Sequence, residues 1–361
     1  MTEKDPLAEI RARIDEIDAA IQQLVSERAE SAAKVAKIKQ EQGETGHFYR
    51  PEREAQILTA VKKRNTGPLS DEAMTGIFRE IMAACLALEK PLKVAFLGPE
   101  GTYSHSAAVK HFGSLIEPEP VSNIEEAFRL VEADGADFSV VPVENSTEGV
   151  INHTLDLLMQ SSLSISGEVE LRIRHNLLSR ESDLASIERV YSHQQSFAQC
   201  RLWLDKYLPN AERLATNSNA EAALLSRDQK HTAAIAGSMA AELYDVPVLK
   251  ADIEDEPDNT TRFVVIGKHK SQPSGNDRTS LLIFAHNRPG ALFNLLEPLA
   301  KRNISMSNIE SRPSRRGVWE YVFFIDIDGH HEDKNVHEAI EAIEKASAMV
   351  TVLGSYPKAS R

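Results

Sequence analysis

The segment from Pro6 to Gly43 constrains the fold more than any other part of the sequence. No glycine or proline lies between these two residues, and Asp5 and Pro6 suit the N-cap and the first position of a helix. About 37 helical residues at about 1.5 Å each give a length of about 55 Å. Because such a helix is longer than a small domain is wide, it needs a packing partner along its length.

An apolar stripe follows this predicted helix, and a cation interrupts it. Arg28 stands where the spacing calls for an apolar residue, and Lys39 lies about 20° from it around the helix. An arginine on a buried seam needs an anion opposite it. Arg11 projects about 100° away and is better placed to serve a symmetry-related site. Burial of the stems alone, with the charged ends in solvent, is the alternative, but the cations together favour an anion site in a helical dimer. The stripe consists of Leu7, Ile10, Ile14, Ile17, Ile21, Leu24, Val35 and Ile38.

Three regions differ in their sequence pattern. We expect a helical domain over residues 1–91, an α/β domain over 92–268 and a small α+β unit over 279–357, with a polar linker at 269–278.

The net charge of −13 argues against a nucleic-acid or anionic-membrane partner, because proteins bind both mainly through Lys and Arg. Cys85 and Cys200 lie in unrelated segments, which predicts no disulfide framework, no metal site and a cytoplasmic protein.

The middle region alternates apolar strands with helices, which predicts largely parallel sheets. Polar residues recur where strands end, and such ends converge on a crevice in α/β folds. Each residue alone is better explained as a cap or a turn residue, but their recurrence favours a cleft. They are Glu144, Asn145, Ser192, His193 and Thr261, together with Thr102 at the start of a helix.

The N-terminal segment "LAEIRARIDEIDAAIQQLVSERAESAAKVAKIK" resembles the first helix of all-helical chorismate mutases, and "YRPEREAQIL" resembles the start of their second helix. The resemblance implies two interlocked protomers, with Arg11 donated from one protomer to the site of the other. It also implies that arginines hold the carboxylates of chorismate, that Lys39 bonds the ether oxygen and that Glu54 takes the ring hydroxyl. The implied site comprises Arg11, Arg28, Lys39, Arg53 and Glu54.

This chain departs from that family at three positions. Arg50 stands where many members carry aspartate, Cys85 where some carry serine, and Glu89 where others carry a glutamine that donates to the ether oxygen. A carboxylate cannot donate, so only protonated Glu89 could replace that glutamine. A solvent-facing glutamate at a helix end is the alternative.

The middle region resembles prephenate dehydratases through "GPEGTYS", "VPVENSTEG", "YSHQQSFAQC" and "NTTRF". The resemblance implies a bilobal fold like that of periplasmic binding proteins, with the site between two α/β subdomains and no metal or redox cofactor. Thr261 is the implied catalytic residue, with Asn145 and Gln199 as polar partners. Arg262 either holds a substrate carboxylate or pairs with the acidic run "DIEDEPD". Gln194 replaces a proline that is common in relatives.

The tail reads βαββαβ, a ferredoxin-like pattern, and it resembles the ACT regulatory domain of prephenate dehydratases. The motifs "GALF" and "ESRP" then imply a phenylalanine site and feedback inhibition. Without the resemblance, a solvated turn and a strand end explain both motifs. The implied effector residues are Gly290, Ala291, Leu292, Glu310, Ser311 and Arg312.

Together these motifs resemble the bifunctional chorismate mutase–prephenate dehydratases, which implies conversion of chorismate through prephenate to phenylpyruvate by a homodimer or a larger homo-oligomer. Fusion to a dehydrogenase would require a Gly-rich dinucleotide turn, which "FLGPEGT" lacks. A non-catalytic phenylalanine sensor with the same folds remains the alternative that the sequence leaves open.

Overall fold

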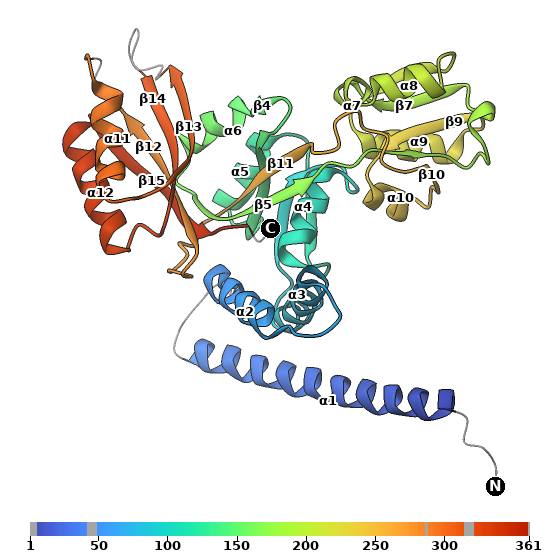
Figure 1. The fold of residues 1–361 in the computed structure, drawn as a ribbon, viewed down its shortest axis with the longest axis horizontal. Helices are drawn as coiled ribbons and strands as arrows, with labels where there is room; N and C mark the ends of the chain where they lie inside the picture. Colours follow the sequence, from blue (N-terminus) through green and yellow to red (C-terminus); the bar gives the residue numbers. More distant parts are fainter. Residues whose placement is uncertain (1–5, 42–48, 286–287, 314–320, 360–361) are drawn as a thin grey trace. The chain divides into compact units, whose positions relative to one another are not determined.

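The computed structural model describes residues 6–41, 49–285, 288–313 and 321–359 (Figure 1). The chain divides into two compact units. The first comprises Met1–Tyr49, Ile57–Leu92 and Phe112–Ile116, and the second comprises Arg50–Gln56, Lys93–His111 and Glu117–Arg361.

The N-terminal region is helical, as expected. It contains α1 (Pro6–Glu41), α2 (Pro51–Arg64) and α3 (Asp71–Ala87). The 36-residue α1 confirms the predicted long helix, although the expected N-cap Asp5 lies outside the described residues. Ser70 caps α3 by accepting a hydrogen bond from the backbone N–H of Ala73.

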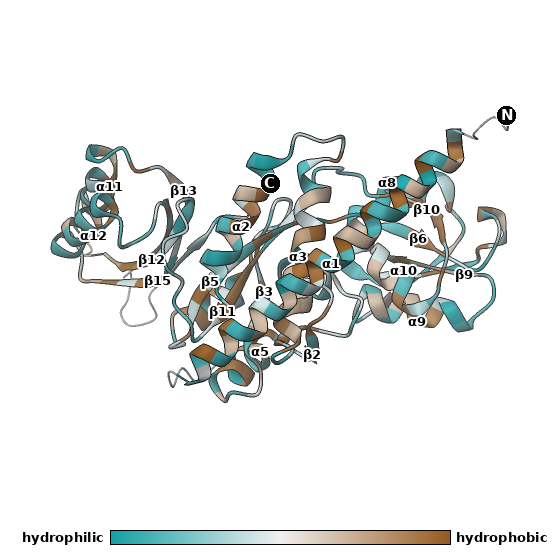
Figure 2. Cartoon of the chain, turned by 90° about the horizontal axis from the view of Figure 1, so that it is seen from below, coloured by the Kyte–Doolittle hydropathy of each residue, from teal (hydrophilic) through white to brown (hydrophobic). Residues whose placement is uncertain are grey.

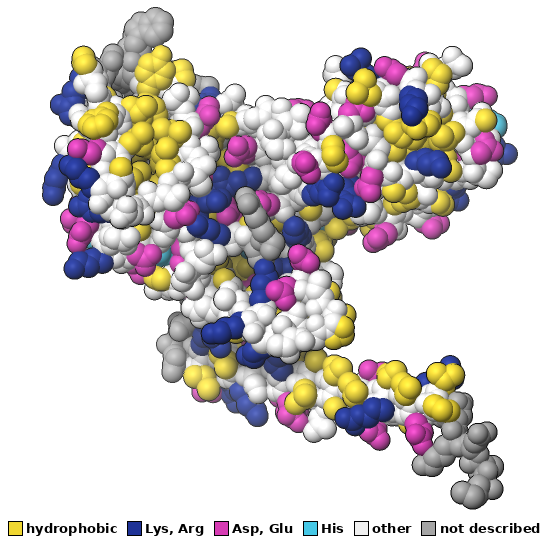
Figure 3. Space-filling model, viewed as in Figure 1, with side chains coloured by type: hydrophobic (Ala, Val, Ile, Leu, Met, Phe, Trp, Pro, Cys, Tyr) yellow, Lys and Arg dark blue, Asp and Glu magenta, His cyan; other side chains and the backbone are white. Residues whose placement is uncertain are grey.

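The apolar stripe of α1 is exposed in the single chain. Its members are between 43% (Ile17) and 64% (Leu24) exposed. Hydrophobic segments recur along the α1 ribbon in Figure 2, and apolar side chains follow α1 on the surface in Figure 3. A row of eight large apolar side chains in water is unusual for a soluble surface.

The first lobe of the second unit is a mixed sheet in the order β2-β1-β3-β11-β5, with β4 paired to β3. β1 runs parallel to β2 and β3, but β11 runs antiparallel to β3 and β5. The expectation of largely parallel sheets therefore holds for β2, β1, β3 and β5, which run in one direction, but β4 and β11 are reversed, β11 because it returns from the second lobe. The elements are β1 (Lys93–Leu97), α4 (Tyr103–Phe112), β2 (Glu117–Val121), α5 (Ile124–Glu132), β3 (Phe138–Asn145), β4 (Gly149–Val150), α6 (Asn152–Leu158), β5 (Ser164–Arg172) and β11 (Thr260–Gly267).

The second lobe is a smaller sheet in the order β10-β6-β9-β7-β8. Residues 173–175 lead into it and residues 251–259 lead back, so the chain crosses twice, as the predicted bilobal fold requires. Its elements are β6 (Asn176–Leu178), η1 (Leu184–Ser186), β7 (Arg189–His193), α7 (Gln194–Gln199), α8 (Arg201–Tyr207), β8 (Glu212–Thr216), α9 (Asn219–Asp228), β9 (Thr232–Ala236), α10 (Ser238–Tyr244) and β10 (Val248–Lys250).

The tail has the predicted βαββαβ order and an antiparallel sheet, β13-β14-β12-β15. Its helices cover a core that includes Leu295, Ile325 and Ile340. The elements are β12 (Asp277–Phe284), α11 (Ala291–Lys301), β13 (Met306–Pro313), β14 (Tyr321–Asp328), α12 (Lys334–Ala346) and β15 (Met349–Pro357).

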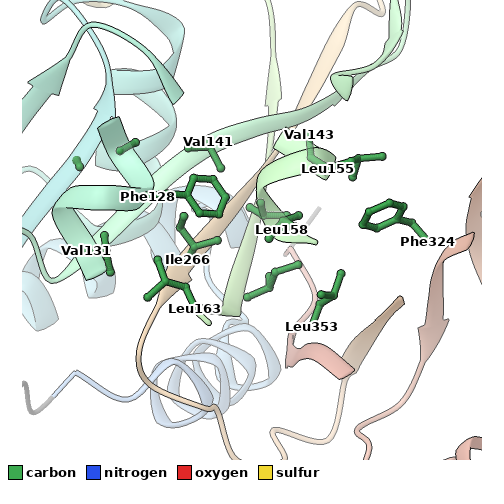
Figure 4. Packing of buried hydrophobic residues seen from close by; sticks show 14 of the residues in the cluster. Phe128, Val131, Val141, Val143, Leu155, Leu158, Leu163, Ile266, Phe324 and Leu353 are labelled. Carbon is green, nitrogen blue, oxygen red and sulfur yellow. The ribbon is translucent and has the colours of Figure 1, made fainter. Parts of the chain in front are cut away.

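The tail sheet and the first-lobe sheet share one hydrophobic core. Phe324 and Leu353 of the tail belong to the same buried cluster as Leu158 and Ile266 (Figure 4). The backbones also approach closely, because a Cβ built on Gly354 would overlap the carbonyl oxygen of Ile165 on β5. The tail is therefore packed directly on the sheet that carries Thr261.

Candidate active site

A cavity of about 740 Å³ lies between the two lobes of the second unit. Its volume is in the range of small-molecule sites. Five of the residues expected at this cleft line it, namely Thr102, Asn145, His193, Gln199 and Thr261. The structure thus brings together side chains that are up to about 160 residues apart in sequence, because strand ends and helix starts of both lobes meet there.

Asn145 and Thr261 are direct neighbours on β3 and β11. The backbone N–H groups of Thr147 and Glu148 both donate to Asn145 Oδ1, each at 3.0 Å. These two bonds fix the orientation of the amide, so its Nδ2 must be the donor on the other side. Nδ2 donates to Thr261 Oγ1 and to Asn259 Oδ1, each at 2.8 Å.

The Thr261 hydroxyl therefore accepts a hydrogen bond, and its own proton remains to be given elsewhere. Within the described part of the chain, this hydroxyl donates to no protein acceptor. The side chain lines the cavity. A hydroxyl that keeps its proton beside a substrate-sized cavity can give that proton to a departing hydroxyl group on a substrate.

A second layer of hydrogen bonds continues from Asn259 across both lobes. Asn259 Nδ2 donates to Gln199 Oε1 at 3.1 Å, and His175 Nε2 lies 2.8 Å from the same oxygen. Because Gln199 Nε2 donates to Glu148 Oε1, the other end of the same amide, Gln199 Oε1, is an acceptor. His175 must therefore carry its proton on Nε2.

Burial lowers the pKa of His175, which favours the neutral ring. Its Nδ1 is then an acceptor 2.9 Å from the Tyr103 hydroxyl, whose single proton is shared between this nitrogen and the carbonyl of Arg174 at 2.8 Å. Tyr103, His175 and Asn259 were not predicted as site residues. Tyr103 and Asn259 stand inside the quoted motifs and could have been found from them. His175 lies on the first crossover and carries no sequence signal.

Two other predicted residues have supporting positions. Ser192 is fully buried and donates to Asn219 Oδ1 at 3.1 Å, so it lies behind the cavity lining and not in it. His193 does line the cavity, and it caps α7 by accepting from the Gln195 N–H. Thr102 Oγ1 donates to the carbonyl of Leu97 at 2.8 Å, which fixes the turn before α4.

Glu144 and Arg262 do not line this cavity, which corrects the expectation that both bind substrate. Side chains alternate between the two faces of a strand, so the neighbours of Asn145 and Thr261 must point away from them. Arg262 instead pairs with Glu168 at 2.9 Å and Asp326 at 2.5 Å. Neither of the two roles expected for Arg262 matches this geometry, because its partners are outside the acidic run as well.

The helical region brings together part of the predicted mutase set. Arg28 of α1 is half-buried, and its Nη1 lies 2.9 Å from Cys85 Sγ of α3. Glu89 lies in the turn after α3 and is half-buried, with no hydrogen-bond partner for Oε2 among the described residues. Burial raises the pKa of Glu89, and the positive charge of Lys39 opposes that shift.

The other predicted mutase residues lie on exposed or partly exposed helix surfaces. Arg11 is exposed on α1. Arg53 and Glu54 occupy the first turn of α2, where Arg53 is exposed and Glu54 is half-buried.

The effector residues expected in the tail lie at a helix start and on an edge strand. Gly290 has a φ of 77° and precedes α11, where Ala291 and Leu292 form the first turn. Glu310, Ser311 and Arg312 lie on β13 at the edge of the sheet. The Arg312 guanidinium donates to the carbonyl of Asn152 on α6 at 2.7 Å.

Among the described helices, none is long and apolar enough to cross a bilayer. The same residues contain no group of three or more His, Cys, Asp or Glu that could hold a metal ion.

Comparison with known proteins assigns a family to each region. Residues 10–90 match chorismate mutase type II, residues 94–271 match prephenate dehydratase, and residues 279–345 match the ACT domain. The bifunctional chorismate mutase/prephenate dehydratase of Pseudomonas aeruginosa is 50% identical over 99% of this chain and 100% of its own length.

Two solved structures are similar to the second unit. The prephenate dehydratase of Arthrobacter aurescens in complex with L-Phe has 35% identity and a TM-score of 0.67, over 74% of this chain and 90% of its own. The prephenate dehydratase of Staphylococcus aureus has 29% identity and a TM-score of 0.66, over 73% and 100%. With both catalytic regions and the regulatory region present in order along the chain, this protein belongs to the bifunctional chorismate mutase/prephenate dehydratase family.

Proposed function

We propose that the cavity between the lobes is the prephenate dehydratase site and that Thr261 gives its proton to the leaving hydroxyl. In this reaction the bond to the ring carboxylate breaks and CO2 departs. The electron pair enters the ring, the C–O bond breaks, and the hydroxyl takes up a proton to leave as water. The observation that carries the proposal is the bond from Asn145 Nδ2 to Thr261 Oγ1. A threonine hydroxyl is a very weak acid, so it acts as a positioned donor rather than through a matched pKa.

The lining of the cavity suggests how the dianionic substrate is held. None of the described lining residues is a lysine or an arginine. Two helices of ten residues begin at the cavity, α4 at Tyr103 and α9 at Asn219. Free N–H groups and the helix dipole make such starts favourable places for carboxylates. We infer that the two substrate carboxylates are bound mainly by helix starts and hydroxyl groups.

The test is a pair of substitutions at one position. Thr261→Val keeps the shape of the side chain without the hydroxyl, and Thr261→Ser keeps the hydroxyl. Phenylpyruvate formation from prephenate should collapse in the first and survive in part in the second. Chorismate mutase activity of the same preparations reports folding. If Thr261→Val retained the kcat of the wild type, Thr261 would not be the donor.

We propose that the mutase site forms only in a dimer. The exposed stripe of α1 supports this, since a second copy would remove it from water. Arg28, Lys39, Arg53, Glu54 and Glu89 would come from one protomer and Arg11 from the other. The rearrangement of chorismate needs no acid, base or nucleophile, so a basic cage acts by holding the compact conformer and stabilising charge on the ether oxygen. Arg28→Ala should abolish this activity and leave phenylpyruvate formation from prephenate unchanged.

We propose that phenylalanine inhibits the dehydratase through the tail. The relative from Arthrobacter aurescens was solved with L-Phe, and the exposed edge strand β13 could pair with a second copy. Gly290–Leu292 and Glu310–Arg312 would form the effector site. Titration calorimetry with phenylalanine, beside inhibition assays on the full chain, tests this regulation.

We also propose that the three regions comprise residues 1–91, 92–268 and 279–357. The two buried free cysteines fit a reducing cytoplasm.

A further inference from the structure

Arg262 is the immediate neighbour of Thr261 on β11, and the two side chains leave opposite faces of the strand. Thr261 lines the cavity between the lobes. Arg262 points to the tail sheet, where it meets residues of β14 and β15. A movement of the Arg262 guanidinium therefore acts on the backbone that holds Thr261.

The contacts of Arg262 are buried and come from three strands. Glu168 of β5 accepts at 2.9 Å, Asp326 of β14 at 2.5 Å and the Tyr356 hydroxyl of β15 at 3.0 Å. The side chains of Arg262, Glu168 and Asp326 are 12%, 1% and 10% exposed. Charge-assisted hydrogen bonds of this kind fix both distance and direction, so the Arg262 side chain has one well-defined position.

The β11 ladder itself is irregular at this place. Its register with β3 shifts between Arg262 and Phe263, one residue pair beyond the pair of Thr261 with Asn145. A bulge disrupts the ladder and changes the local direction of a strand. On the β5 side the register is regular from Thr260 to Val265, so the side-chain anchor at Arg262 adds its constraint on the β3 side, where Asn145 lies.

The proposed effector strand lies close to this anchor. Glu310 of β13 and Arg262 line the same cavity of about 30 Å³, which is room for about two water molecules. β13 also pairs with β14, with Asn308 opposite Asp326. Any shift of β13 on effector binding would be transmitted to Asp326 and from there to Arg262.

We propose that Arg262 is a positioning residue for the dehydratase, which holds Thr261 against Asn145, and that the contact of Arg262 with Asp326 carries the phenylalanine signal. This rests on the proposed roles of Thr261 and of the tail. The physical requirement is that phenylalanine prefers one of two arrangements of the tail sheet, since an effector shifts an equilibrium only by its differential affinity.

The experiment compares three substitutions in the full chain. Arg262→Lys keeps the charge but cannot reach Glu168 and Asp326 together. Asp326→Asn has the same shape but lacks the charge. Arg278→Lys is the matched control, because Arg278 also pairs with Glu168 and is similarly buried but is not beside Thr261. For each, kcat and KM for prephenate, the mutase kcat, and phenylalanine binding by calorimetry are measured.

We expect Arg262→Lys to lower the dehydratase kcat by about ten- to a hundredfold, because a misplacement of about 1 Å can cost that much, with little change in KM. Asp326→Asn should still bind phenylalanine, but the inhibition, typically about 5–150-fold in coupled systems, should fall toward none. Arg278→Lys should keep the wild-type kcat.

Each result decides between roles. An equal loss of kcat in Arg262→Lys and Arg278→Lys would mean that Arg262 is only structural and would overturn the proposal. Wild-type inhibition in an Asp326→Asn protein would overturn the signalling step. If the wild-type protein neither bound phenylalanine nor was inhibited by it, the proposed regulation would be refuted instead. Loss of the mutase kcat would mark a variant as misfolded. If Arg262→Lys were misfolded, the isosteric Asp326→Asn would decide whether the proposal holds.

Discussion

Asn145→Asp should switch off the dehydratase by reversing the hydrogen bond to Thr261, and it also removes the bond that Nδ2 donates to Asn259 Oδ1. The substitution conserves shape, and one carboxylate oxygen can still accept from the N–H groups of Thr147 and Glu148. The other oxygen replaces the Nδ2 that now donates to Thr261 Oγ1 at 2.8 Å. The Thr261 hydroxyl would then turn and donate to the carboxylate, so its proton would be lost to the cavity.

The loss of one positioned donor at a reacting oxygen costs about 10²–10³ in kcat. The new carboxyl group would be buried, since Asn145 is 6% exposed, and burial raises the pKa of a carboxyl group. Below that pKa the protonated carboxyl could donate to Thr261 as the amide does. The activity of Asn145→Asp should therefore rise as pH falls, whereas the wild type has no titrating group at this position.

The assay is the pH dependence of kcat for phenylpyruvate formation from prephenate. Asn123→Asp is the matched control, because the Asn123 side chain also accepts a backbone N–H, that of Glu126 at 2.9 Å, and caps α5 outside the cavity. Aspartate is as good an N-cap as asparagine. If Asn145→Asp matched this control at neutral pH, the assigned direction of the Asn145–Thr261 bond would be wrong.

Three further predictions follow from buried charge and exposed apolar surface. Burial raises the pKa of Glu89, so the protonated form that can donate a hydrogen bond persists below that pKa and is lost above it. The mutase kcat should therefore fall as pH rises, and Glu89→Gln should flatten this pH profile. A flat profile of the wild type would contradict the prediction. Glu168→Gln removes a buried carboxylate from Arg278 and Arg262, of which Arg262 keeps Asp326, and should cost about 3–5 kcal/mol in the free energy of unfolding. Glu125→Gln in an exposed pair should cost at most about 1 kcal/mol, and similar shifts of the urea midpoint would refute the difference. Ile17→Asp on the stripe of α1 should dissociate the proposed dimer in sedimentation experiments and abolish mutase activity, and an intact dimer would show that the stripe is not the interface.

The residues of the dehydratase cavity differ in how far the sequence could predict them. Asn145 ends one apolar strand and Thr261 begins another, and the recurrence of polar residues at such strand termini was enough to place both at a common cleft. Glu144 was expected at the same cleft because it is a polar residue near a strand end, and Arg262 because holding a substrate carboxylate was one of its two expected roles. Strand alternation already excluded that assignment, so this error was avoidable. His175 was not predictable, because the crossover that carries it has no periodic pattern.

The sequence by itself determined the long helix, the order of the three regions and the βαββαβ pattern of the tail, because these depend on local spacing of apolar residues, glycine and proline. Only the tertiary structure decided which polar groups face one another. The direction of the Asn145 amide depends on two backbone N–H groups beside it, and the partners of Arg262 come from strands that are about 60 to 100 residues distant. The close approach of Gly354 to Ile165 likewise follows from the packing of two sheets. Such contacts depend on the whole fold, and no local pattern records them.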